Sequence, residues 1–207
     1  MSEESILTND KLSALFYQKG KDDGLCVGVP HHVSLGVTQL PCFTHSDSDE
    51  NAGLIGYKLS KKLKCSFVIA CNYYFDSNKC NCSDYYKIID IFSPKILIEI
   101  HGHGGKKANF DIEISCGSKS KSSSAEKFAD ILRTQLPEEM KGYSISGNFE
   151  KIYFKAANTT TINTNNWLGV HIELLKKLRS SMDENFLNAL QLSIESFRKE
   201  ISSSANI

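Results

Sequence analysis

An apolar run that stops at a cluster of histidine and glycine is the most constraining feature of this sequence. Lys95–Ile100 has the composition of a buried strand, and His101–Gly105 (HGHGG) follows it at once. Ligands and catalytic groups of open α/β sheets gather at the carboxyl ends of strands. Imidazole is the commonest metal ligand, and glycine lets a substrate approach the backbone closely. The simpler alternative is a glycine-rich turn that carries two surface histidines.

Strand-like apolar runs alternate with amphipathic helical stretches along the chain. The predicted strands are Leu25–Val29, Ser66–Ala70, Lys95–Ile100, Phe110–Ser115, Lys151–Lys155 and Val170–Leu174. The predicted helices are Asn51–Leu63, Tyr85–Phe92, a segment opened by a Ser123-x-x-Glu126 capping box, and Asp183–Ser202. This alternation predicts a three-layer α/β/α fold of the hydrolase or phosphorylase kind, with a mixed, largely parallel central sheet. We expect residues 1–207 to form one domain with a frayed tail at Ser202–Ile207.

Composition and charge argue against several classes of function. Lysine and arginine together number 24, as do aspartate and glutamate, so no basic excess favours nucleic-acid binding. No apolar run approaches the roughly 20 residues that a transmembrane helix needs, so no membrane partner is expected. The N-terminal residues show no basic segment followed by an apolar core. We therefore expect a cytoplasmic protein, whose oligomeric state the sequence leaves open.

The seven cysteines are expected to be reduced thiols, because the sequence shows no export signal. Cys80 and Cys82 form the only close pair, and a single residue separates them. A structural zinc site usually needs two pairs with two to four residues between the cysteines. The spacing therefore argues against a structural zinc site at this pair.

Two of the predicted strands lead into histidines that could bind a metal ion, namely His31 and His101. If these strands are parallel, both imidazoles meet at one edge of the sheet, where Asp49 or Glu50 could join them from the start of the next predicted helix. Two imidazoles, one carboxylate and an open position make a catalytic zinc site. A carboxylate bound to the metal cannot also act as a free base, so a further one is needed. Glu173, on a late apolar strand, is the candidate.

Several short segments occur in one order along the chain: Pro30–Gly36, Asp49–Gly53, Asn72–Lys79, Ile98–Gly105 and His171–Arg179. Taken together, they resemble the N-formylglutamate amidohydrolase-like family, whose proteins are similar in fold to zinc carboxypeptidases. The resemblance implies zinc ligands at His31, at Asp49 and at His101. His31 and His32 are hard to separate, because His32 stands where the family more often has a small residue. Glu50 is the alternative to Asp49.

The resemblance also implies roles around the metal. Glu173 matches the late-strand general base of zinc carboxypeptidases. Apart from the resemblance, His103 is the second catalytic candidate, and its alternative is a solvated residue of the turn. Asp76, Asn78 and Lys79 resemble an Asp-x-Asn-Arg motif on the substrate side, with lysine where the family frequently has arginine. Lysine is a point charge, so it does not replace a bidentate arginine clamp. The residues expected to bind substrate are Asn72, Asp76, Asn78, Lys79 and Arg179.

The function expected from these residues is hydrolysis of an amide bond next to a carboxylate, with zinc or another divalent metal as cofactor. Examples of such substrates are N-acyl amino acids and γ-glutamyl compounds, so the expected partner is a small acidic molecule. The alternative is a non-catalytic metal- or ligand-binding protein that keeps the fold, because fold alone does not decide function.

Overall fold

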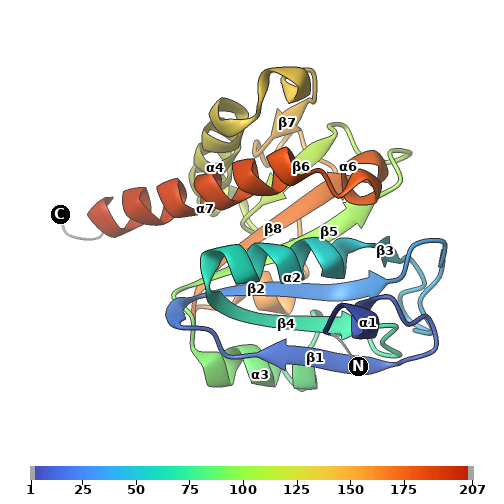
Figure 1. The fold of residues 1–207 in the computed structure, drawn as a ribbon. Coiled ribbons are helices and arrows are strands. Elements are labelled where there is room, and N and C mark those ends of the chain that lie inside the picture. The colour runs from blue at the N-terminus through green and yellow to red at the C-terminus, as the bar shows by residue number, and fades with distance from the viewer. Residues whose placement is uncertain (1–2, 205–207) are drawn as a thin grey trace.

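The computed structural model describes residues 3–204 as a mixed β-sheet with helices on both faces (Figure 1). Across the sheet, the strands follow the order β1 (Ala14–Gln18), β4 (Cys65–Cys71), β2 (Asp22–Val33), β5 (Ile96–His103), β8 (Leu168–Leu175), β6 (Ile112–Ser115) and β7 (Ile145–Ser146). The short strand β3 (Asp49–Glu50) pairs with β2. Strands β4, β2, β5 and β8 are parallel, whereas β1 and β6 run antiparallel to β4 and β8. The expected mixed, largely parallel sheet is confirmed.

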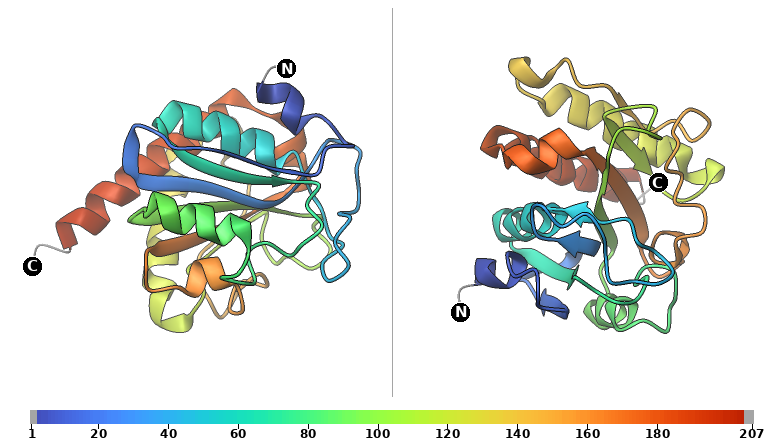
Figure 2. Two further views of the ribbon diagram at one scale, coloured as in Figure 1. Left: turned by 90° about the horizontal axis from the view of Figure 1, so that it is seen from below. Right: turned by 90° about the vertical axis from the view of Figure 1, so that its right-hand side faces the viewer.

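Helices cover both faces of the sheet and complete the three predicted layers (Figure 2). One face carries α2 (Ala52–Leu63), α4 (Ser122–Gln135) and α7 (Glu184–Ser204), and the other carries α3 (Asp84–Phe92) and α5 (Thr160–Asn163). The shorter helices are α1 (Glu3–Leu7) and α6 (Lys176–Ser181), with 3-10 turns at Lys119–Lys121 and Glu138–Met140. Each face has its own apolar core, and the smaller one lies under α3.

The parallel strands are covered by helices on both sides, and this explains their composition. Every residue of β4 is buried, and its sequence, CSFVIAC, is almost continuously apolar. Strands of this kind do not show the alternation of a half-exposed sheet. The helices, in contrast, keep a period near 3.6, and the predicted stripe of α2 is buried at Ala52, Ile55, Leu59 and Leu63.

Replacing Phe197 with alanine should lower the free energy of unfolding by about 3–5 kcal/mol, the usual range for a buried phenylalanine. Phe197 lies on α7 with none of its surface exposed, and its ring meets that of Phe128 on α4 edge to face at 5.2 Å between centroids. Chemical denaturation measures the change. Leu192 on the same helix is 46% exposed and supplies the control, since Leu192→Ala should cost less than about 1 kcal/mol. Equal effects of both variants would contradict the packing of α7.

Two strands, β2 and β5, extend into the histidine segments that were predicted to follow them. Strand β2 continues through Pro30, and β5 continues through the His-Gly-His segment. The ladder between β2 and β4 is irregular between Val29 and His32, where the missing N–H of the proline falls. His31 and His101 therefore lie within the ends of their strands rather than after them.

The strand predicted at Lys151–Lys155 is wrong, because this segment is a loop. The backbone amides of Tyr153 and Phe154 donate to the carboxylate of Glu113, at 2.9 and 2.8 Å, and not to a neighbouring strand. The same carboxylate accepts the amides of Asn109 and Phe110. One buried side chain thus takes the place of a β-ladder and joins two loops.

The predicted capping box is also wrong, since α4 begins at Ser122, one residue before the expected cap. The Glu126 carboxylate accepts hydrogen bonds from the side chains of Ser122 (3.3 Å) and Asn148 (2.9 Å). At the other end of the chain, α7 continues to Ser204, so the residues from Ser202 are helical where fraying was expected. The rest of that tail, residues 205–207, lies outside the described residues.

The expectation of seven reduced thiols needs correction, because Cys80 and Cys82 are joined by a disulfide. Both lie in the short loop that leads into α3. The remaining cysteines of the described chain are buried and unpaired. Among residues 3–204, no helix is long and apolar enough to cross a membrane.

Candidate functional site

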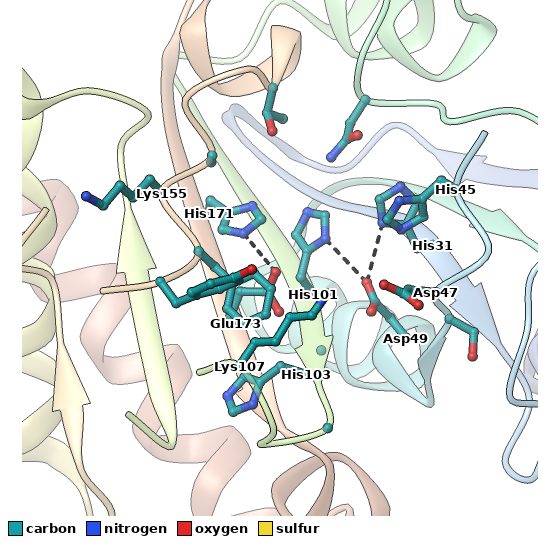
Figure 3. Close-up of a pocket in the computed structure, with 18 of the residues that line it drawn as sticks. His31, His45, Asp47, Asp49, His101, His103, Lys107, Lys155, His171 and Glu173 are labelled. Atoms are coloured by element: carbon teal, nitrogen blue, oxygen red, sulfur yellow. Dashed lines mark hydrogen bonds and ion pairs between the residues drawn. The ribbon is translucent and has the colours of Figure 1, made fainter. Parts of the chain in front are cut away.

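Four neighbouring strands bring the candidate residues to one edge of the sheet (Figure 3). His31 comes from β2, Asp49 from β3, His101 from β5 and Glu173 from β8. Because β2, β3, β5 and β8 are parallel neighbours, their carboxyl ends meet at this edge. Asp49 was expected in the first turn of a helix. It lies in a strand instead, and α2 begins only after Asn51, whose φ of 61° turns the chain.

Two imidazoles and a carboxylate converge at the centre of the site. Oδ2 of Asp49 lies 3.6 Å from Nδ1 of His31 and 3.3 Å from Nδ1 of His101, and all three side chains are buried. Oδ2 of Asp49 makes no hydrogen bond with any residue that the structure describes. Buried polar atoms normally make hydrogen bonds, so an oxygen that has only ion-pair contacts with two imidazoles fits a cation site. The three donor atoms match the ligand set of a catalytic divalent metal site with an open position.

When no metal is bound, the neighbouring carboxylates favour the protonated form of both imidazoles. Burial alone would lower the pKa of His101, but the carboxylates of Asp49 and Glu99 outweigh it and raise the pKa to about 10. Burial likewise opposes protonation of His31, yet Asp49 and Asp76 raise its pKa. The two imidazoles in turn hold the pKa of Asp49 far below its usual value, against the effect of its burial. A metal ion would displace these protons, so its uptake is coupled to proton release.

Carboxylates also lie behind both imidazoles. Oδ1 of Asp76 is 3.1 Å from Nε2 of His31, and Oε2 of Glu99 is 3.3 Å from Nε2 of His101. Carboxylates in this position fix the orientation of metal-binding imidazoles. Asp76, expected on the substrate side, therefore lies where it can orient His31. Glu99 was missed, although the period of two along β5 places it on the same strand face as His101.

Glu173 lies beside the cluster with one free oxygen. Its Oε1 is 3.1 Å from Nε2 of His171, and its Oε2 makes no hydrogen bond within residues 3–204. Burial raises the pKa of Glu173 to about 7. Burial also lowers the pKa of His171 well below its usual value, helped by the charge of His101, and this favours the neutral imidazole beside Glu173. A carboxyl group that titrates near neutral pH is suited to general base catalysis.

The structure separates the alternatives that adjacent residues left open. Nε2 of His32 is 2.8 Å from the carbonyl oxygen of Leu7, and its Nδ1 accepts the amide N–H of Gly53. Both ring nitrogens of His32 are therefore occupied away from the cluster. The Glu50 carboxylate forms an ion pair with Lys176 at 2.6 Å. His31 rather than His32, and Asp49 rather than Glu50, therefore reach the cluster.

Two of the residues expected to bind substrate hold the framework instead. The amide of Asn72 donates to the carbonyls of Asn9 and Leu12. Arg179 is buried behind β5 and donates to three carbonyl oxygens, those of Glu50, His103 and Leu174. A Cβ at Gly102 would lie 2.1 Å from the Arg179 guanidinium, so this glycine makes room for an arginine rather than for a substrate.

An open cavity of about 820 Å³ lies over the cluster. His31, Asp49, His101, Glu173 and the predicted residues His103, Asn78 and Lys79 line it. His103 uses both ring nitrogens, since Nε2 is 3.0 Å from the carbonyl oxygen of Asp111 and Nδ1 accepts the amide of Gly105. The lining residues missed from the sequence come from loops, and they include His45, Asp47, Lys106, Lys107, Tyr153, Phe154 and Lys155.

His45 lies in the loop between β2 and β3 and stacks on His31, with 4.1 Å between ring centroids. Lys106 and Lys107 directly follow the HGHGG segment. Their closeness to His103 along the chain could have predicted that they line the cavity. No pattern in the sequence marked His45 or Lys155, because the positions of these loops depend on tertiary contacts.

No protein-family model matches this chain, and no curated protein matches it in sequence. Solved structures do match. A bacteriophage poly-γ-glutamate hydrolase superposes with a TM-score of 0.59 at 9% identity, over 91% of this chain and 91% of that one. The two proteins share a fold.

A gene product of Agrobacterium tumefaciens gives a TM-score of 0.56 at 14% identity, over 93% of this chain and 95% of the other. An N-acetylmuramoyl-L-alanine amidase of Nostoc punctiforme gives 0.50 at 9% identity, over 90% and 99%. Identities this low establish the fold alone. The resemblance to N-formylglutamate amidohydrolases is thereby reduced to a fold shared with hydrolases and amidases.

Proposed function

We propose that this chain is a metal-dependent hydrolase of amide bonds that lie next to a carboxylate, such as those of N-acyl amino acids or γ-glutamyl compounds. The observation that carries the proposal is the cluster of His31, Asp49 and His101 beside Glu173 at the floor of an open cavity. The fold supports it, because poly-γ-glutamate hydrolase and N-acetylmuramoyl-L-alanine amidase share it. The motifs that resemble N-formylglutamate amidohydrolases fit the same chemistry.

Each residue of the site has a distinct part in this reaction. Nδ1 of His31, Oδ2 of Asp49 and Nδ1 of His101 would hold a divalent ion such as zinc, which polarises a carbonyl and makes water more acidic. Glu173 takes the proton of the attacking water on its free Oε2 and passes it to the nitrogen of the leaving amine. His171 holds the other oxygen of Glu173 and so fixes the orientation of the carboxylate.

Lysines on the walls of the cavity support an acidic substrate. Lys79, Lys106 and Lys107 line its walls, and Lys155 also lines it, although the ammonium group of Lys155 lies over the ring of Phe149. Lys79 donates to the hydroxyl of Thr159 at 3.0 Å, which holds its ammonium group at the wall. Ammonium groups attract carboxylates without requiring a fixed geometry, so they suit substrates that carry one or more acidic groups.

Metal analysis followed by a substrate panel tests the proposed function. We expect the purified protein to bind about one equivalent of zinc and to hydrolyse N-acylated glutamate, N-acylated aspartate or γ-glutamyl peptides. The matched controls are the same compounds with the carboxylate converted to an amide, which should react at least 10-fold more slowly because the lysines then lack a charged partner. Metal uptake with no turnover on the panel would favour the non-catalytic binding protein. Absence of metal uptake would overturn the proposal.

A further inference from the structure

One buried carboxylate of the sheet has no part in the reaction described above. Glu99 lies on β5 two residues before His101, with none of its surface exposed, on the side of the imidazole opposite to Asp49. Burying a charged group is costly unless it is paired and hydrogen-bonded. A glutamate at the centre of a parallel sheet therefore needs an explanation.

Both oxygens of Glu99 face hydrogen-bond donors. Oε1 accepts the hydroxyl hydrogen of Tyr85 at 3.1 Å, and Oε2 accepts an amide hydrogen of Asn78 at 3.5 Å and lies 3.3 Å from Nε2 of His101. Tyr85 is itself wholly buried and comes from α3, on the smaller face of the sheet. The carboxylate is thus held from a helix, a loop and its own strand.

The neighbouring strand leaves space for this arrangement. Gly28 on β2 is paired in register with Glu99. A Cβ at Gly28 would lie 2.2 Å from the hydroxyl oxygen of Tyr85 and 3.2 Å from Cγ of Glu99. No side chain fits at such distances, so the glycine permits the contact between Tyr85 and Glu99.

These contacts decide which nitrogen of His101 keeps its hydrogen when the imidazole becomes neutral to bind a metal ion. A carboxylate with donors around it can only accept, so Glu99 requires a hydrogen on Nε2 of His101. A neutral imidazole has one N–H, and placing it on Nε2 leaves the lone pair on Nδ1. Nδ1 is the atom that faces Oδ2 of Asp49 at 3.3 Å.

We propose that Glu99 is a positioning residue for the metal site, which holds His101 in the tautomer that binds a metal ion through Nδ1 while Tyr85 and Gly28 keep the carboxylate in place. The inference rests on the proposed function, because it assumes the metal cluster of His31, Asp49 and His101. Glu99 does not contact the cavity, so it acts only through the imidazole.

Glu99→Gln tests the proposal. The glutamine side chain keeps the size of glutamate, but it has a single acceptor oxygen for three donors, and its NH₂ group cannot accept a hydrogen from Nε2. We expect the Kd for zinc, measured by competition with a chelator, to rise about 10–100-fold, as is usual when a partner of a metal ligand is lost. Long-range ¹⁵N NMR of the zinc-loaded wild type should show a hydrogen on Nε2 of His101 and zinc on Nδ1.

Two further variants separate positioning from general stability. Glu113→Gln also removes a buried carboxylate from the sheet, but Glu113 accepts only backbone amides, so this variant should lower Tm and leave the Kd for zinc unchanged. Tyr85→Phe removes one hydrogen bond to Glu99 and should weaken zinc binding in the same direction by a smaller factor. If Glu99→Gln does not fold, the Kd of Tyr85→Phe for zinc tests the proposal instead.

The outcomes are distinct. A wild-type Kd for zinc in Glu99→Gln, or in Tyr85→Phe where Glu99→Gln does not fold, overturns the role of Glu99 and leaves the metal site in place. Zinc bound through Nε2 of His101 in the wild type also overturns it. A wild-type protein that binds no zinc overturns the proposed function, and the inference with it. Weaker binding in Glu99→Gln and unchanged binding in Glu113→Gln support the inference.

Discussion

Replacing Glu173 with glutamine should lower turnover by about 10²–10⁴-fold, the usual contribution of a general base, and leave the metal content unchanged. Glutamine keeps the shape of the side chain but cannot accept a proton. Glu173 is suited to the role because Oε2 makes no hydrogen bond among the described residues and because burial raises its pKa to about 7. Steady-state kinetics on an acidic N-acyl substrate measures the loss, and elemental analysis measures the metal.

Glu50→Gln is the matched control for Glu173, since Glu50 is also a buried carboxylate near the edge of the sheet but pairs with Lys176 outside the cluster. The turnover of Glu50→Gln should stay within about threefold of the wild type, since an ion pair with a solvent-exposed lysine contributes little to stability. Loss of metal together with turnover in Glu173→Gln would place Glu173 among the ligands. Unchanged turnover would remove Glu173 from the mechanism.

The second large effect is expected at the metal itself: His101→Ala should abolish stoichiometric zinc binding. The variant removes one of two imidazoles and leaves Asp49 with a single partner, so fewer than the three protein ligands of a catalytic site remain. Elemental analysis after dialysis gives the zinc content per chain.

His103→Ala is the control for His101, because it removes an imidazole from the same strand. Both nitrogens of His103 already have backbone partners, so it cannot replace His101, and its loss should leave about one equivalent of zinc bound. The double variant should behave as His101→Ala does. A full equivalent of zinc in His101→Ala would show that the site lies elsewhere.

The convergence of His31 and His101 could be predicted from the sequence, because parallel strands carry their ends to one edge of a sheet. The choice between His31 and His32 could not. Adjacent residues of a strand point to opposite faces, so the choice depends on the register and on the irregularity that Pro30 causes in β2. His31 faces the cluster, whereas His32 faces the amide of Gly53.

The local sequence pattern predicted the wrong secondary structure where a distant side chain replaces hydrogen bonding between strands. Lys151–Lys155 has the composition of a strand, but the amides of its central residues are held by Glu113, which lies about forty residues away in the sequence. The same limit applies to the walls of the cavity. Lys155 is held at the cavity by this contact and by the Ser115 hydroxyl, which donates to its carbonyl oxygen, and no periodicity within its own segment encodes such contacts.

Arg179 has a consequence for how a metal ion would enter. Its guanidinium joins backbone carbonyls at Glu50, His103 and Leu174, and these residues belong to the three strands that carry Asp49, His101 and Glu173. Burial lowers the pKa of Arg179, but the charges of Asp49, Glu173 and Glu50 oppose that shift, and a guanidinium stays charged near neutral pH. The donor atoms are therefore preorganised. In the proposed function, an incoming ion would exchange with protons of the cluster, at donor atoms on strands that Arg179 already joins.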